Sequence, residues 1–366
     1  MTDIFQIEPS LQDYWFCFLV LNMVIILSYK KIDKLKPNKL NWFIALLFCV
    51  FFAKWETDYF SYNRGFYLLS EEYRDPLYYY IKFFSFGSYE LWRTIVWGGA
   101  LILFNKTCKR LNISANILMY IFSVFFLMTF SYARASLAMA SYFYGLSCIV
   151  CSPKKIKLGL FFVLFSYFAH RSSLLLIVML PLIYMRFNKK RMLLFLLLSP
   201  ILMLLMNKAL IILNAGTISD DSVISGFTDA AQHYAYYNRK DLAINWKFEL
   251  VTKLRNYSFY ILYAYISYRL IKLKFNVDEG IKRFFSISTI LIYISSLFIF
   301  NTGAVGMTDI IGQRYLYFLG IPLCLLLSYL IQNGYCTKKM MNILVFLAFV
   351  YIEGWLLGKI ASLGYF

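Results

Sequence analysis

Hydrophobic residues fill long stretches of the chain, and short polar stretches separate them at intervals close to the length of one membrane span. Early examples are the apolar runs over residues 14–28, 41–53 and 91–104. About 20 apolar residues in a helix cross the hydrocarbon core of a bilayer. The pattern therefore predicts an all-α polytopic integral membrane protein of about twelve transmembrane helices, with residues 1–366 forming a single transmembrane domain.

Composition supports this class. The 366 residues are 61% hydrophobic and 20% aromatic, and the mean hydropathy is +0.62. A chain of this kind could not cover its surface with polar groups in water.

Basic residues reveal a topology when the loops are assigned alternately to two faces of a membrane. One face receives 22 of the 37 Lys and Arg residues, with only Asp33, Asp278 and Glu279 as acids. Cytoplasmic loops carry such an excess of positive charge. The basic clusters lie within residues 30–39, 106–110, 154–157, 186–191, 269–283 and 338–339.

The N-terminal segment carries Asp3, Glu8 and Asp13 and no Lys or Arg. This argues against a cleaved signal peptide and predicts an N-terminus on the outside.

Several other classes are disfavoured by the sequence. The basic residues lie in short clusters between apolar runs, so nucleic-acid binding is not expected despite the net charge of +18. A GxxxxGK[ST] phosphate loop is absent from the sequence, which argues against a pump with its own ATPase. Cys148 and Cys151 form a CxxC at the end of an apolar run, and we interpret them as buried thiols.

Two outer loops are expected. One covers residues 54–76, and the longer one covers residues 214–247. A connection of the second length is more often a lid, a binding loop or a disordered segment than a simple linker. We interpret it as lid-like.

Polar residues at the outer ends of spans are the candidates for chemistry, because ionisable groups are costly near hydrocarbon. In the first outer loop these are Asp58, Tyr62, Arg64 and Asp75. Asp75 precedes Pro76, and a carboxylate before an initial proline also suits a simple helix cap. Asp58 has no such structural explanation.

Four further residues lie at outer turns or at the starts of inward spans. Arg134 begins a span rich in small residues, His170 and Arg171 form a sharp turn, and Arg314 precedes an apolar span. Interface anchoring is the alternative for Arg134 and Arg314, and helix capping is the alternative for His170 and Arg171.

The outer arginines suggest a ligand. Arg64, Arg134, Arg171 and Arg314 would lie near one membrane surface. Guanidinium groups stay charged and bind phosphate oxygens in pairs. A lipid-linked diphosphate in the outer leaflet would place its headgroup at this depth.

The motifs carrying these residues resemble a known family. In order they are ETDYFSYNRGF, DPLYYYI, RASLAMA, AHRSSLLL and QRYLYF, between residues 56 and 318. This ordered set is similar to the EpsG-like branch of the Wzy-type bacterial polysaccharide polymerases. The hydroxyl that serves the family role in the AHRSSLLL motif stays open, because Ser172 and Ser173 are both present.

The resemblance implies a membrane glycosyltransferase of the bacterial inner membrane, with a fold resembling GT-C-type glycosyltransferases and an active site on the outer face. Its substrate would be an undecaprenyl-diphosphate-linked oligosaccharide repeat, polymerised into O-antigen, capsule or exopolysaccharide. Membrane lipid, a chain-length regulator and a flippase are the implied partners.

General chemistry then assigns expected roles. Deprotonating the acceptor hydroxyl needs a base, for which Asp58 and His170 are both candidates. Arg64, Arg134, Arg171 and Arg314, with Tyr62 and Asp75, are expected to bind the diphosphate or the sugars. The sequence has no Asp-x-Asp pair and no His cluster with metal-ligand spacing, so neither a metal ion nor a cofactor is expected.

Three other functions stay open. A lipid-linked oligosaccharide flippase would also need basic groups, but alternating access requires charges along a central path. A membrane O-acyltransferase could use His170 as its base. An O-antigen ligase differs only in its acceptor.

Overall fold

The computed structural model describes residues 10–32, 34, 36–52, 63, 66–67, 76–125, 127, 133–171, 173–184, 246–299 and 308–363, with residues 194, 197–198, 200–201 and 204–205. In these ranges the chain forms helices and turns, without a strand. The helices are α1 (Leu11–Lys30), α2 (Lys39–Leu47), η2 (Phe48–Phe52), α4 (Pro76–Phe84), α5 (Tyr89–Arg110), α6 (Ala115–Phe125), α7 (Ala133–Val150), α8 (Ile156–Ala169), α9 (Ser173–Val178), η5 (Leu180–Tyr184), α12 (Trp246–Lys272), α13 (Glu279–Ile299), α14 (Thr308–Gln332) and α15 (Lys338–Leu363).

The expected all-α class is confirmed, and its apolar helices fit a membrane protein. Three helical stretches in the described residues are long and apolar enough to cross a membrane: Leu11–Lys30, Glu279–Leu297 and Tyr315–Gln332. The count of about twelve spans stays a prediction, because part of the chain, including most of residues 185–245, lies outside the described residues.

Local sequence signals explain where several helices begin. The Ser10 hydroxyl accepts a hydrogen bond from the Asp13 amide at 3.2 Å, and the Asp13 carboxylate accepts one from the Ser10 amide at 2.9 Å. This reciprocal capping box satisfies amides that have no partner within α1. The described part of α4 runs from Pro76 to Phe84, and proline is favoured at the first position of a helix.

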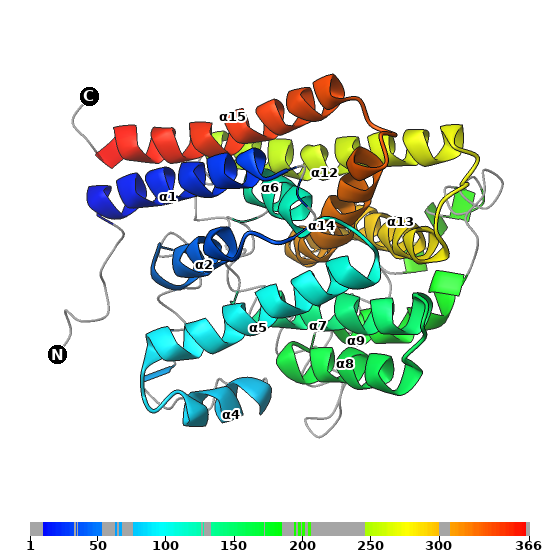
Figure 1. The fold of residues 1–366 in the computed structure, drawn as a ribbon, viewed down its shortest axis with the longest axis horizontal. Helices are drawn as coiled ribbons and strands as arrows, with labels where there is room; N and C mark the ends of the chain where they lie inside the picture. Colours follow the sequence, from blue (N-terminus) through cyan, green and yellow to red (C-terminus); the bar gives the residue numbers. More distant parts are fainter. Residues whose placement is uncertain are drawn as a thin grey trace.

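α14 is the central helix. Of its apolar stretch Tyr315–Gln332, 89% is buried, against 28% of α1. α13 packs along α14, and α6 and α12 also contact it. α1 and α15 run beside each other at the periphery, and α1 begins on the side where α15 ends (Figure 1).

Two glycines bring α7 and α8 into close contact. A Cβ atom at Gly145 would lie 2.7 Å from the Gly159 carbonyl oxygen, and one at Gly159 would lie 2.8 Å from the Gly145 carbonyl oxygen. Real Cβ atoms do not approach backbone so closely, so both positions require glycine. The start of α7 and the end of α8 lie about 18 Å and about 15 Å from this contact, by the rise of an α-helix. The two helix ends are therefore at a similar height.

Polar contacts gather several basic loops at one end of the bundle. The Asn116 amide donates to the carbonyls of Lys34 and Lys36 at 2.6 and 2.9 Å. The Gln332 side chain donates to the Asn112 carbonyl at 2.8 Å and accepts from the Ser114 amide at 2.6 Å. We call this the basic end.

Arginines make similar links between helices at the same end. Arg110, the last residue of α5, donates to the carbonyls of Ser147, Cys151 and Pro153 at 3.1, 3.0 and 2.6 Å. The ends of α5 and α7 are thereby joined.

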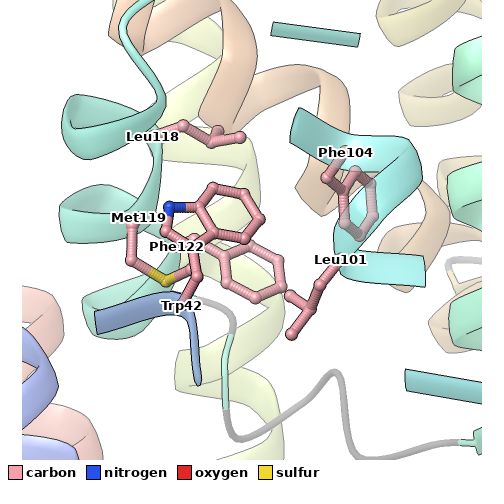
Figure 2. Close-up of a pocket in the computed structure, with 6 residues that line it drawn as sticks. All are labelled: Trp42, Leu101, Phe104, Leu118, Met119 and Phe122. Carbon is pink, nitrogen blue, oxygen red and sulfur yellow. The ribbon is translucent and has the colours of Figure 1, made fainter. Parts of the chain in front are cut away.

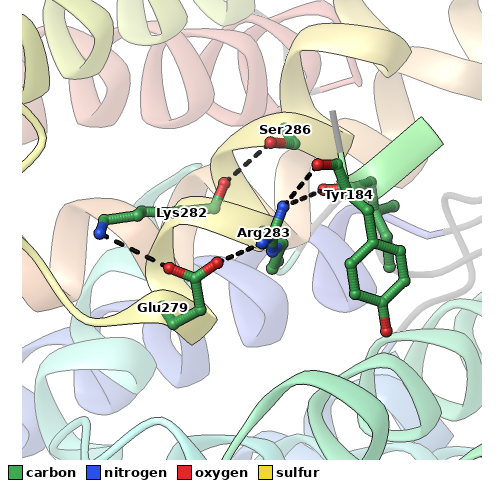
Figure 3. A network of polar contacts seen from close by, with 6 residues as sticks. Tyr184, Glu279, Lys282, Arg283 and Ser286 are labelled. Atoms are coloured by element: carbon green, nitrogen blue, oxygen red, sulfur yellow. Dashed lines mark hydrogen bonds and ion pairs between the residues drawn. The ribbon is translucent and has the colours of Figure 1, made fainter. Parts of the chain in front are cut away.

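A second arginine joins η5 to α13, as Figure 3 shows. Arg283 donates to the carbonyls of Ile183 and Tyr184 at 3.2 and 2.9 Å, and it pairs with Glu279. Lys282 lies 3.5 Å from the same carboxylate. Glu279 and Lys282 are partly exposed, so their ion pair contributes little to the free energy of folding. The hydrogen bonds from Arg283 matter more, because they satisfy two backbone carbonyls.

The junction of α2, α5 and α6 is tightly packed (Figure 2). Only about 10 Å³ is open there. Its lining consists of aromatic, leucine and methionine side chains, and the space is too small for a polar substrate. The residues around it are Trp42, Leu101, Phe104, Leu118, Met119 and Phe122.

Candidate functional site

The candidate residues on described helices lie at the ends remote from the basic end. Arg134 is the second residue of α7, His170 follows α8, and Arg314 lies in the second turn of α14. α7 and α14 each have their opposite terminus among the basic-end contacts. The backbone positions of Arg134, His170 and Arg314 therefore agree with the common end predicted from the sequence. The side chains of Arg134 and Arg314 lie outside the described residues.

The turn after α8 is well defined by backbone hydrogen bonds. The His170 amide donates to the Ser166 carbonyl at 2.9 Å, and the Ser173 amide donates to the His170 carbonyl at the same distance. The Leu174 amide donates to the Arg171 carbonyl at 3.0 Å. His170 is half-buried and Arg171 is exposed, and the turn lies at the end of α8 remote from the basic end.

Ser173 is the described hydroxyl of the AHRSSLLL motif. Its side chain is fully buried, and its oxygen has no hydrogen-bond partner within the described part of the chain. Most buried polar atoms in proteins have a partner, and a buried group without one costs about 1–3 kcal/mol. Ser173 is therefore a buried polar group on the first turn of α9, directly after the turn that contains His170.

A hydrogen bond joins this turn to α7. The Tyr142 hydroxyl donates to the Leu176 carbonyl of α9 at 3.0 Å. Together with the glycine contact between α7 and α8, it holds the His170 turn against α7, the helix that carries Arg134. The structure thus unites two motifs that are separated by about 35 residues of sequence.

The first outer loop is only partly described. Asp58, Tyr62, Arg64 and Asp75 lie outside the described residues, and so does the lid-like loop apart from the start of α12. Phe66 is described and is 99% buried, with its ring 5.5 Å from Tyr89 and 6.3 Å from Trp92. Lys82 donates to the Phe66 carbonyl and lies 5.0 Å from its ring. The end of the ETDYFSYNRGF motif is therefore attached to α4 and α5.

Arg93 was missed by the sequence analysis. It is fully buried, near the start of α5. Its guanidinium donates to the carbonyls of Cys49 and Val50 at 2.7 and 3.0 Å and to the Tyr89 hydroxyl at 3.3 Å, and it lies 4.3 Å from the Trp97 ring. The sequence did contain a signal for it. Arg93 is a single charged residue inside the apolar run over residues 91–104, and charged residues within membrane spans are rare and usually functional.

A groove of about 440 Å³ lies between α1, α6 and α15, away from these residues. Lys30 and Tyr29, at the basic end of α1, are part of its lining, with Tyr120 and Asn342. It is therefore remote from the predicted chemistry.

The CxxC cysteines are buried free thiols, as expected. Cys151 lies in the turn after α7, and burial raises the pKa of its thiol to about 11. The thiol consequently stays protonated at neutral pH, which makes it a poor nucleophile. In the described ranges, no group of three or more His, Cys, Asp and Glu side chains could hold a metal ion.

Comparison with known proteins gives one match. The model of the EpsG family matches residues 39–361, which include every motif quoted above. No curated protein and no solved structure matches the chain.

Proposed function

The chain belongs to the EpsG family, which indicates a polysaccharide polymerase, and from this premise we propose its reaction. It joins undecaprenyl-diphosphate-linked oligosaccharide repeats into a long cell-surface polysaccharide. The reaction takes place at the outer face of the bacterial inner membrane, at the ends of α7, α8 and α14 remote from the basic end.

The proposed step is a glycosyl transfer between two lipid-linked substrates. A hydroxyl at the non-reducing end of a new repeat attacks the anomeric carbon of the growing chain. The bond from that carbon to the lipid diphosphate breaks, and the hydroxyl proton passes to Asp58 or His170. The growing chain, longer by one repeat, is then carried by the new lipid diphosphate.

Charge develops on the departing diphosphate, and preorganised cations stabilise it. Arg134, Arg171 and Arg314 are assigned this role, and Arg64 supports it from the first outer loop. Tyr62 and Asp75 are assigned to the sugar and headgroup contacts. One observation carries this proposal: three separate motifs of the matched family lie on helix ends that share one end of the bundle.

The proposed partners follow from the reaction. A flippase of a separate chain delivers the lipid-linked repeat to the outer face, and a chain-length regulator sets the size of the product. Both roles require contact with this membrane domain or with its lipid substrate.

The test is reconstitution of the purified protein in lipid vesicles with the lipid-linked repeat, without ATP and with a chelator. We expect a ladder of products spaced by one repeat. Transfer to a different lipid acceptor without a ladder would instead indicate a ligase, and movement of the unchanged repeat across the bilayer would indicate a flippase. Strict dependence on added Mg²⁺ or Mn²⁺ would overturn the arginine assignment.

A further inference from the structure

The groove between α1, α6 and α15 has a polar end and an apolar end. On α1, its lining begins with Lys30 and Tyr29 at the end of the helix. It continues with Ile26 and Ile25, about one turn further from the basic end. The lining that α1 supplies therefore changes from charged and polar to aliphatic with distance from the basic end.

α15, which runs beside α1 (Figure 1), repeats this order. Asn342 lines the groove near the start of α15, and Phe346 and Phe349 line it about one and two turns further along. Residues three and four apart are neighbours on a helix, so these three residues share one face. Lys339 is exposed and lies one turn before Asn342 on the same face. Both helices thus place polar groups at the same end of the groove.

The third wall is Tyr120 of α6. Tyr120 is buried, and its ring lies 5.6 Å from the ring of Tyr29. Ile26, Tyr29 and Phe346 are more than half exposed. The groove is therefore closed by α6 and open at its rim, and its volume of about 440 Å³ is within the range of about 300–1,000 Å³ that is usual for small-molecule sites.

Positive charge surrounds the polar end of the groove. Residues 28–40 and 336–342, which include the end of α1 and the start of α15, contain seven Lys and one Asp. Basic pockets between membrane helices on the cytoplasmic side bind anionic lipid headgroups. The charge therefore favours a ligand that is negative at one end and apolar at the other.

We propose that this groove binds an anionic phospholipid of the leaflet at the basic end. The Lys30 ammonium and the Asn342 amide donate to the phosphate oxygens. An acyl chain lies along Ile26, Phe346 and Phe349. The lipid thereby joins α1 to α15, the first and last described helices. This binding does not depend on the proposed transfer reaction.

Other occupants fit the groove less well. A zwitterionic phospholipid has the same acyl chains, but its own cation would lie among the lysines. A soluble phosphate would leave the apolar part of the groove unfilled. A second copy of this chain, placed symmetrically on the same surface, would bring Lys30 and Lys339 close to the same two lysines of the other copy, and like charges repel.

The experiment titrates the full-length protein in detergent with phosphatidylglycerol, phosphatidylcholine or glycerol phosphate and follows its thermal midpoint. A ligand that binds only the folded protein raises the midpoint as its concentration rises. We expect phosphatidylglycerol to bind about fivefold more tightly than phosphatidylcholine, as one lysine contact to an anionic headgroup provides. Glycerol phosphate, which has the headgroup charge without acyl chains, should cause no shift.

A first pair of variants tests the charge. Lys30→Gln should weaken phosphatidylglycerol binding about fivefold and leave phosphatidylcholine binding unchanged. Lys157→Gln is the matched control, because Lys157 is exposed and basic but lies on α8, which does not line the groove. Its affinity for phosphatidylglycerol should equal that of the wild type.

A second pair tests the groove without changing any charge. Ile26→Trp should weaken phosphatidylglycerol binding by about tenfold, because the larger side chain occupies the acyl-chain position. Leu19→Trp is its control, since Leu19 is exposed on the same face of α1 but lies two turns away, outside the lining. Its affinity should be that of the wild type.

Four outcomes would overturn the proposal. Equal binding of phosphatidylglycerol and phosphatidylcholine would remove the role of charge, and an equal shift with glycerol phosphate would indicate a soluble anion. Equal losses in Lys30→Gln and Lys157→Gln would indicate diffuse attraction to the basic end. Dimers that form without lipid and dissociate in Ile26→Trp would show that a second copy occupies the groove.

The proposal stays testable if Lys30→Gln does not fold. Ile26→Trp and Leu19→Trp then decide, and equal phosphatidylglycerol affinity in these two variants would overturn it. All these measurements report binding rather than turnover. Failure of the polymerase assay would therefore leave the lipid site unaffected, and loss of the lipid site would leave the polymerase proposal unaffected.

Discussion

Arg93 and Arg134 are both near the start of a long helix, yet they have different surroundings. Arg93 is buried and donates to two carbonyls of η2. Arg134 is in the first turn of α7, where a positive charge is opposed by the helix dipole. The dipole therefore gives no reason for an arginine at this position, and interface anchoring and substrate binding are the two roles that the following variants separate.

Arg134→Ala should abolish long polymer while the protein stays folded in the membrane. Loss of one preorganised donor to a developing charge typically costs about 100- to 1,000-fold in rate. Arg134→Lys should rescue only part of it, since a point charge cannot replace a planar fork. Polymer length and yield in the vesicle assay are the measurements.

Lys157→Ala is the control for this prediction, because Lys157 is exposed and basic but belongs to a predicted inside cluster. It should leave polymer yield unchanged. Polymer of normal length from correctly inserted Arg134→Ala protein would remove Arg134 from the site.

At the scale of elements, the α7–α8 pair holds the two motifs together. Glycine normally weakens a helix relative to alanine. Gly145 and Gly159 are needed nevertheless, because each lies against the backbone of the other helix. Their close approach aligns the start of α7 with the turn after α8, so a structural contact inside the bundle sets the geometry at its end.

Gly145→Ala should destabilise the protein by about 1–3 kcal/mol, since the added carbon would meet backbone atoms that cannot move aside. Gly354→Ala in α15 should be neutral or stabilising by up to about 1 kcal/mol, as nothing lies within 4 Å of its Cβ position. Thermal unfolding of both variants in detergent tests this. Equal midpoints would show that α7 and α8 are not in such close contact.

At the scale of the whole molecule, the basic loops converge at one end and the candidate motifs on described helices lie at the other. The contacts of Asn116, Gln332 and Arg110 draw together loops from four parts of the chain. Such a division of charge is expected of a membrane protein, because an excess of Lys and Arg in the cytoplasmic loops sets its orientation in the bilayer. The orientation itself is a prediction from the sequence.

Cysteine labelling in cells measures that orientation. All seven native cysteines are buried, so an added exposed cysteine should dominate the signal. We expect Arg171→Cys to react with an impermeant maleimide from outside, and Lys157→Cys to react only after permeabilisation. Labelling of both from the same side would contradict the topology.

The site was only partly predictable from the sequence. Arg134, His170 and Arg314 were identified because ionisable groups at span ends are costly and therefore informative. Arg93 was overlooked, although it too is a charge within an apolar run. Its importance depends on Cys49 and Val50, more than 40 residues away in sequence, and no local pattern indicates that pairing.

The sequence by itself determined the helical class, the alternation of basic and other loops, and the family motifs. These properties follow from hydrophobicity, charge and local backbone chemistry, which each segment carries alone. Only the tertiary structure decided that Gly145 meets Gly159, that Arg93 donates to the carbonyls of Cys49 and Val50, and that Phe66 packs on α5. Those contacts join distant segments, and their partners are selected by the packing of the whole bundle.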